Sequence, residues 1–100
     1  MPFEQVRPRA FTASSVREHA PAASGVYGIS NRIEWIYIGE TDNIQDSLLG
    51  HLGEMDTSLR SRQPTGFVFE ACDRANRPSR QDRLVLEYEP SCNRNWSRHR

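Results

Sequence analysis

Apolar residues in this chain follow two different periods, and the change from one to the other predicts its elements. Residues 25–30 and 34–39 are rich in Val, Ile, Tyr and Trp, which favours two strands joined across Asn31 and Arg32 as a hairpin. Residues 66–72 have the same character and predict a third strand.

Helical segments alternate with these strands. Residues 12–15 supply N-cap candidates for a short helix that runs to about residue 19 and is stopped by Pro21. Thr41 and Asp42 can cap a second helix, in which apolar residues recur at intervals of four, four and three positions. These residues form one buried face: Ile44, Leu48, Leu52 and Met55.

Prolines delimit two further helices. Asp56 and Thr57 begin a short helical piece that ends before Pro64. Pro78 can open the last helix, and Pro90 ends it, because proline suits the first helical turn and breaks a helix interior. The apolar face of this last helix holds Leu84, Val85 and Tyr88.

The order α, β, β, α, α, β, α predicts a small α+β domain. Its sheet is expected to have three mainly antiparallel strands packed by helices. Residues 12–93 would form this domain, residues 1–11 an extended leader, and residues 94–100 a basic tail.

Composition points to a protein without a membrane segment. Hydrophobic residues make up 36% of the chain, the mean hydropathy is −0.75, and no apolar run approaches the ~20 residues of a membrane span. The first residues lack the apolar core of a secretory signal, so a cytoplasmic location is expected. Cys72 and Cys92 lack metal-ligand spacing, which favours small buried hydrophobes.

Charge is placed unevenly along the chain. All 13 basic residues are arginine. Residues 1–56 carry four arginines against eight acids, giving −4, and residues 57–100 carry nine arginines against five acids, giving +4. Any polyanion is therefore expected to meet the second half.

Two short triplets with nine residues between their tyrosines carry the most specific signal: Gly25-Val26-Tyr27 and Tyr37-Ile38-Gly39. They are followed at matching spacing by Thr41, Asn43, Ile44, Leu48 and His51, and near the end by Leu84-Val85, Tyr88, Pro90 and Asn93. In these residues the chain resembles the GIY-YIG nuclease family, and its ending resembles the excision-repair members. The resemblance spans roughly residues 12 to 93.

The resemblance implies divalent-metal-assisted cleavage of a nucleic-acid phosphodiester. In the family, the tyrosine at Tyr27 is proposed to activate water, and the tyrosine at Tyr37 and a helix arginine support the phosphate. A glutamate on the last helix holds the metal. Cations and fixed donors are needed because the transition state gathers negative charge on the phosphate oxygens.

Two of these family roles are not filled in the present sequence. The arginine position is Ser47 and the glutamate position is Gln81. A hydroxyl is no guanidinium, and a neutral amide binds magnesium weakly, so no metal is expected. If the chain is active, Asp82 or Glu87 would supply the carboxylate for Mg²⁺ or Mn²⁺.

The charges around these positions leave nucleic-acid binding open. Asp42 and Asp46 add negative charge near the cleft that a phosphate backbone would enter. Arg80 and Arg83 flank Gln81 and are the candidates for nucleic-acid binding, although exposed helix arginines also lie in plain solvent.

The hairpin register leaves the tyrosines with two interpretations. They are either sheet aromatics or descendants of an active-site pair. A five-residue loop, residues 30–34, would pair Ile29 with Trp35 and place Tyr27 opposite Tyr37. A two-residue loop would place the tyrosines on opposite faces of the sheet.

Four further positions each have two interpretations. His51 is either a wall of the site or a boundary histidine bonded to backbone, and Gln81 is either a relic of a metal site or a satisfied core amide. Asn93 is a turn residue or a site residue. Trp96 with the tail arginines, Arg94, Arg98 and Arg100, is either a stacking surface for single strands or a frayed end.

Three functions follow from these observations. The leading hypothesis is a degenerate GIY-YIG domain that persists as a binding or interaction module, with nucleic acid as one partner class. The second is a weak metal-dependent endonuclease. The third is a domain for an unknown protein partner, without a nucleic-acid role.

Overall fold

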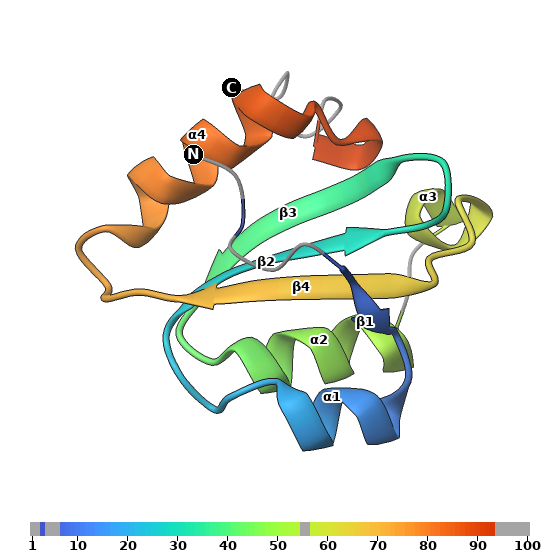
Figure 1. The fold of residues 1–100 in the computed structure, drawn as a ribbon, viewed down its shortest axis with the longest axis horizontal. Coiled ribbons are helices and arrows are strands. Elements are labelled where there is room, and N and C mark those ends of the chain that lie inside the picture. The colour runs from blue at the N-terminus through green and yellow to red at the C-terminus, as the bar shows by residue number, and fades with distance from the viewer. Residues whose placement is uncertain (1–2, 4–6, 55–56, 94–100) are drawn as a thin grey trace.

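A computed structural model describes residue 3, residues 7–54 and residues 57–93. The elements along the chain are β1 (Arg9–Ala10), α1 (Ala13–His19), β2 (Gly25–Ser30), β3 (Trp35–Thr41), α2 (Ile44–Gly53), α3 (Thr57–Ser61), β4 (Gly66–Ala71) and α4 (Arg77–Tyr88). The strands form one antiparallel sheet in the order β1-β4-β2-β3. Helices α1 and α2 cover one face of this sheet and α4 covers the other (Figure 1). Among the described residues, no helix is long and apolar enough to cross a membrane.

The sheet has four strands rather than the three predicted. The additional strand, β1, lies in the segment expected to be a leader, and it pairs Arg9 with Phe67 and Ala10 with Gly66. Only two residues take part, so no alternating pattern was long enough to mark a strand.

Helix caps explain where the first two helices begin. Thr12 caps α1, as predicted, and its Oγ1 accepts from the backbone N–H of Ser15 at 3.3 Å. The cap of α2 is Asn43, so the prediction of Thr41 or Asp42 was wrong. Thr41 is still the last residue of β3, and its hydroxyl accepts from the N–H of Asn43 at 3.1 Å.

The β2–β3 hairpin has neither of the registers predicted from the sequence. Ser30 pairs with Trp35 across a four-residue loop, and a bulge then shifts the register so that Tyr27 lies opposite Gly39. The bulge adds one residue to β3, which a count of loop residues does not detect. Gly39 lies two residues after Tyr37 on β3, and residues two apart on a strand point to the same face. Tyr27 and Tyr37 therefore share a face of the sheet.

Two apolar clusters lie on the two faces of the sheet. On the face of α1 and α2 the fully buried members include Ile29, Ile36, Ile44, Leu48 and Phe67, with Leu52 partly buried beside them. Met55, predicted to extend this stripe, lies outside the described residues, as does the basic tail of residues 94–100. Cys72 and Cys92 form no disulfide within the part of the chain that the structure describes, and both are only partly buried.

Phe3 belongs to the cluster on the face of α4. Its ring centroid lies 6.0 Å from that of Trp35 and 5.8 Å from that of Tyr88, and its N–H donates to the Tyr88 hydroxyl at 3.1 Å. Val26, Ile38, Val68 and Leu84 complete the buried part of this cluster. Phe3 and β1, both in the segment expected to be a leader, therefore pack with the rest of the domain.

Candidate functional site

Three aromatic side chains from the two triplets and α2 form one cluster. The hydroxyl of Tyr27 lies 2.8 Å from Nε2 of His51. The Tyr37 ring centroid lies 6.1 Å from that of Tyr27 and 5.5 Å from that of His51. The fold thus brings together Tyr27, Tyr37 and His51.

Gly39, which ends the second triplet, makes room for this cluster. It is the cross-strand partner of Tyr27 on β3. A Cβ atom at Gly39 would lie 2.7 Å from the Tyr27 hydroxyl oxygen and 2.9 Å from the Tyr37 ring. The glycine is therefore required by packing, whether or not the site performs chemistry.

The two tyrosines are held in the neutral form. Burial raises the pKa of Tyr27 far above 10, and the neighbouring Tyr37 hydroxyl raises it further. Burial also raises the pKa of Tyr37. A neutral Tyr27 can donate to His51, in which case Nε2 accepts and the ring proton lies on Nδ1.

Alkaline pH is expected to destabilise the fold through these tyrosines. Unfolded tyrosines release protons near pH 10, whereas Tyr27 and Tyr37 keep theirs to higher pH in the folded state. Their contribution to stability is therefore full below pH 10 and falls above it, by up to about 1.4 kcal/mol per pH unit for Tyr27 and by less for the more exposed Tyr37. Urea unfolding across this range measures the slope, and Tyr27→Phe should have a shallower one. Equal slopes in the two proteins would contradict the assignment.

Ser47 stands where the resemblance implies an arginine, and its side chain is engaged within the fold. Its Oγ lies 2.6 Å from Oγ1 of Thr41. This contact joins the first turn of α2 to the end of β3 and carries no charge. Ser47 is half-buried, and its hydroxyl is used in this contact at the start of the helix.

Gln81 stands where the resemblance implies a metal-binding glutamate, and it is bonded to the edge strand. Its Nε2 donates to the carbonyl oxygen of Ile38 at 3.1 Å. The same carbonyl accepts from Nδ2 of Asn93 at 2.9 Å, and Oδ1 of Asn93 accepts from the N–H of Ile38 at 2.6 Å. Gln81 thus fits the interpretation of a satisfied amide, and Asn93 is a buried link between the chain after α4 and β3.

Comparison with known proteins places this arrangement in a known fold. Neither protein-family models nor curated protein sequences give a match. Among solved structures, the chain is similar to the N-terminal endonuclease domain of UvrC from Thermotoga maritima bound to magnesium, with a TM-score of 0.65 and 20% identity over 77% of this chain and 93% of that one. The chain has a GIY-YIG endonuclease-like fold. Two point mutants of the UvrC domain bound to its catalytic divalent cation match equally well in structure, at 20% and 19% identity, each over 77% of this chain and 92% of that one.

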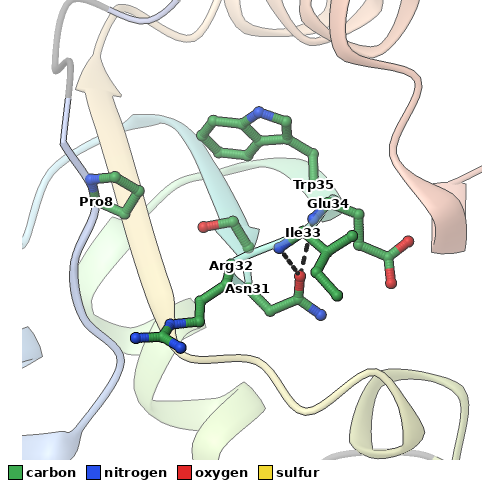
Figure 2. Close-up of a pocket in the computed structure, with 7 residues that line it drawn as sticks. Pro8, Asn31, Arg32, Ile33, Glu34 and Trp35 are labelled. Atoms are coloured by element: carbon green, nitrogen blue, oxygen red, sulfur yellow. Dashed lines mark hydrogen bonds between the residues drawn. The ribbon is translucent and has the colours of Figure 1, made fainter.

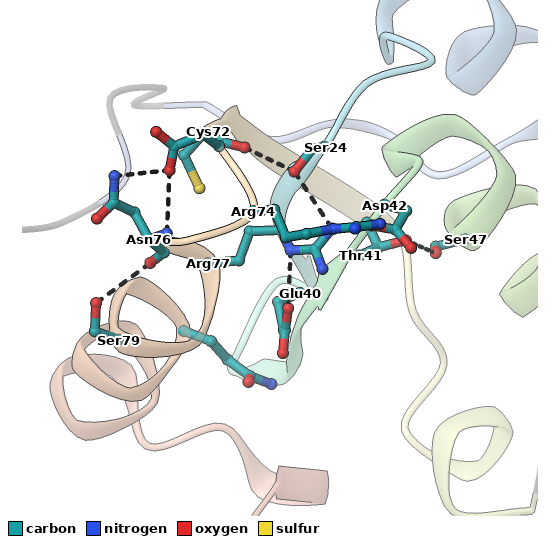
Figure 3. A network of polar contacts seen from close by, with 12 residues as sticks. Ser24, Glu40, Thr41, Asp42, Ser47, Cys72, Arg74, Asn76, Arg77 and Ser79 are labelled. Atoms are coloured by element: carbon teal, nitrogen blue, oxygen red, sulfur yellow. Dashed lines mark hydrogen bonds and ion pairs between the residues drawn. The ribbon is translucent and has the colours of Figure 1, made fainter.

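An ion-pair network that the sequence did not reveal lies at one end of this GIY-YIG-like fold (Figure 3). Nε of Arg77 lies 3.0 Å from Oε1 of Glu40, and Nη1 lies 2.5 Å from Oδ1 of Asp42. Arg74 also reaches Asp42, at 3.0 Å. Hydrogen bonds from Arg77 and then Arg74 hold the pKa of the Asp42 carboxyl below its usual range. The two carboxylates nearest this end of β3 are therefore neutralised from α4 and the loop before it.

The predicted nucleic-acid arginines on α4 have different surroundings. Arg80 forms a two-pronged ion pair with Glu70, with both nitrogen to oxygen distances at 2.7 Å. Such paired geometry is strong and directional, so this guanidinium is engaged inside the fold. Arg83 is exposed, and so are Asp46, Asp82 and Glu87.

At the position where the resemblance implies a carboxylate for the divalent cation, the chain has the neutral amide of Gln81. Magnesium is usually held by carboxylates, waters and phosphate oxygens. Within residues 3, 7–54 and 57–93 there is no group of three or more His, Cys, Asp or Glu side chains that could hold a metal. Gln81 is neutral and uses its amide N–H on Ile38.

Proposed function

We propose that this chain is a GIY-YIG-fold domain that has lost phosphodiester hydrolysis and persists as a nucleic-acid-binding module. One observation carries the proposal. At both positions where the family places a charged group, Ser47 and Gln81, the side chain is neutral and bonded to its own fold. The aromatic cluster is retained, whereas the charges that would act on a phosphate are absent from these two positions.

The missing charges bear directly on rate. Removing one preorganised donor from a transition state typically costs about a hundred- to a thousandfold in rate. Replacing a metal carboxylate by an amide removes the charge that holds the cation as well. Asp82 and Glu87 are exposed. This exposure supports the hypothesis of an inactive domain over that of an enzyme in which one of these two carboxylates holds the metal.

Incubation with supercoiled, branched and single-stranded DNA in Mg²⁺ or Mn²⁺ tests the loss of hydrolysis. We expect no cleavage beyond that in protein-free buffer, and the same result for Tyr27→Phe. Robust cleavage that disappears in Tyr27→Phe would overturn the proposal. The double variant Ser47→Arg, Gln81→Glu tests whether these two positions account for the loss of hydrolysis, because it restores the charged groups that the family has there.

Binding is the second part of the test. Affinity for DNA should fall as salt rises, because phosphate contacts release counterions. Binding that does not respond to salt, or no binding at all, would favour the reading as a protein-interaction domain.

A further inference from the structure

The tip of the β2–β3 hairpin carries a hollow at its surface. Its volume is about 210 Å³, and it is lined by Pro8 and by hairpin residues 30–35 (Figure 2). Two other segments meet the hairpin here: Ser30 pairs with Gly66, and Nδ2 of Asn31 donates to the carbonyl of Arg62 at 2.6 Å. Three separate parts of the chain therefore build one surface.

Positive charge gathers at this tip. The segments that meet there, residues 7–10, 30–35 and 60–66, contain five arginines and one acid, Glu34. Arg7, Arg9 and Arg32 are exposed, and the described part of the chain gives none of them an acidic partner. Arg62 pairs with Glu34 at 3.5 Å across an exposed contact, which is a weak kind of pair.

The opposite end of the sheet has a different charge pattern. There Arg74, Arg77 and Arg80 are each matched by carboxylates. A polyanion would have to break these pairs to bind at that end, whereas the arginines at the hairpin tip are already open to solvent. The attraction for phosphate is therefore greater at the tip than at this opposite end.

Apolar groups lie among these arginines. Ile33 is 92% exposed at the end of the hairpin. Trp35 lines the hollow, and its ring packs against Tyr88 and Phe3, with ring centroids 4.7 Å and 6.0 Å away. Proteins bind single-stranded nucleic acid through this combination, with cations along the backbone and apolar or aromatic surfaces against the bases.

We propose that the hairpin tip binds single-stranded nucleic acid, with Arg7, Arg9 and Arg32 on phosphates and with Ile33 and Trp35 against bases. The inference rests on the proposed function and assigns its surface. This surface is separate from the tyrosine cluster, because Trp35 packs with the apolar cluster under α4 and Tyr27 with the cluster under α1 and α2. Bases in a duplex are stacked and paired, so a duplex exposes less base surface for Ile33 and Trp35 to contact than a single strand does.

The test is the binding of a labelled oligothymidylate, followed by fluorescence anisotropy at several salt concentrations. Wild type should bind, with affinity falling as salt rises. Arg32→Gln should weaken binding and reduce the log–log salt slope by roughly 0.7, the value for one phosphate of a single strand. In the triple variant Arg7→Gln, Arg9→Gln, Arg32→Gln, affinity should lose most of its dependence on salt concentration. The matched control is Arg17→Gln, which removes an exposed arginine from α1 and should bind as wild type does.

A second measurement reports on the hollow itself. In a Trp96→Phe background, Trp35 is the one tryptophan left in the sequence, and oligothymidylate should change its fluorescence. Binding that is weakened by Arg83→Gln and unaffected by Arg32→Gln would overturn the hairpin-tip surface and leave the proposed function standing. Absence of salt-dependent binding in wild type would overturn both. Preference for polyglutamate over the oligonucleotide would show an acidic-protein site instead, and would also overturn the proposal.

Discussion

Replacing Gly25 with alanine is expected to destabilise the fold by roughly 3 kcal/mol, at the upper end of the usual cost of overpacking. Gly25 begins β2, the strand between β3 and β4. A Cβ atom there would lie 2.3 Å from the carbonyl oxygen of Glu70, 2.9 Å from Cα of Ala71 and 2.8 Å from Cδ1 of Ile44. Two of these atoms are backbone, so strands would have to separate. For a chain of this size the midpoint of thermal unfolding should fall by roughly 12 to 24 °C.

Gly50 provides the matched control for this substitution. It lies inside α2, and nothing stands within 4 Å of the position its Cβ would take. Gly50→Ala is expected to stabilise the protein by about 1 kcal/mol, since alanine favours the helix over glycine. If Gly25→Ala melted within a degree or two of wild type, the close approach of β4 and α2 to Gly25 would be wrong.

Replacing Asn93 with alanine is expected to cost about 2 to 3 kcal/mol. The side chain is buried and makes two hydrogen bonds to Ile38, one to its N–H and one to its carbonyl. Gln81 still satisfies the carbonyl in the variant, but the N–H of Ile38 is left without that acceptor. An unsatisfied buried donor costs about 1 to 3 kcal/mol. Equilibrium unfolding in urea measures the loss.

Ser91 serves as the comparison for Asn93 because it lies two residues earlier in the same segment. Its hydroxyl is buried, and the described residues offer it no hydrogen-bond partner. Ser91→Ala should therefore leave stability unchanged or raise it slightly. Equal losses for the two alanine variants would mean that the segment contributes packing alone, and would refute the role given to Asn93.

Sequence pattern predicted the larger elements because their signals are local. Thr12 caps a helix one turn away, and Ile44 and Leu48 recur at the period of a helix that buries one face. β1 and the bulge in β3 depend instead on pairing between distant segments. Neither Arg9 nor Ile36 differs from its neighbours in any local property that marks these features.

The candidate site divides in the same way. The two triplets and the helix histidine have fixed spacing, so Tyr27, Tyr37 and His51 were found from the sequence and the fold brings them together. The ion-pair partners of the arginines on α4 were not predicted from the sequence. Arg77 meets Glu40 from a position 37 residues away, and Arg80 meets Glu70 across a loop, and no spacing rule links such pairs.

The geometry around the two tyrosines depends on two glycines. Gly25 and Gly39 are required by close packing of strands and rings. At the positions where the family has charged groups the chain has Ser47 and Gln81, whose neutral side chains hydrogen-bond within the fold. Packing therefore accounts for these two glycines of the triplets without any catalytic role.

The hydrogen bond from Phe3 to Tyr88 spans 85 positions of a 100-residue chain. The apolar cluster on the α4 face, which contains Val26 and Trp35, is complete only when Phe3 and Tyr88 are both in place. During synthesis Phe3 leaves the ribosome long before α4 does, so one side of the sheet is left open until α4 has been made. Closing so long a loop is entropically slow, and we expect this contact to form late in folding.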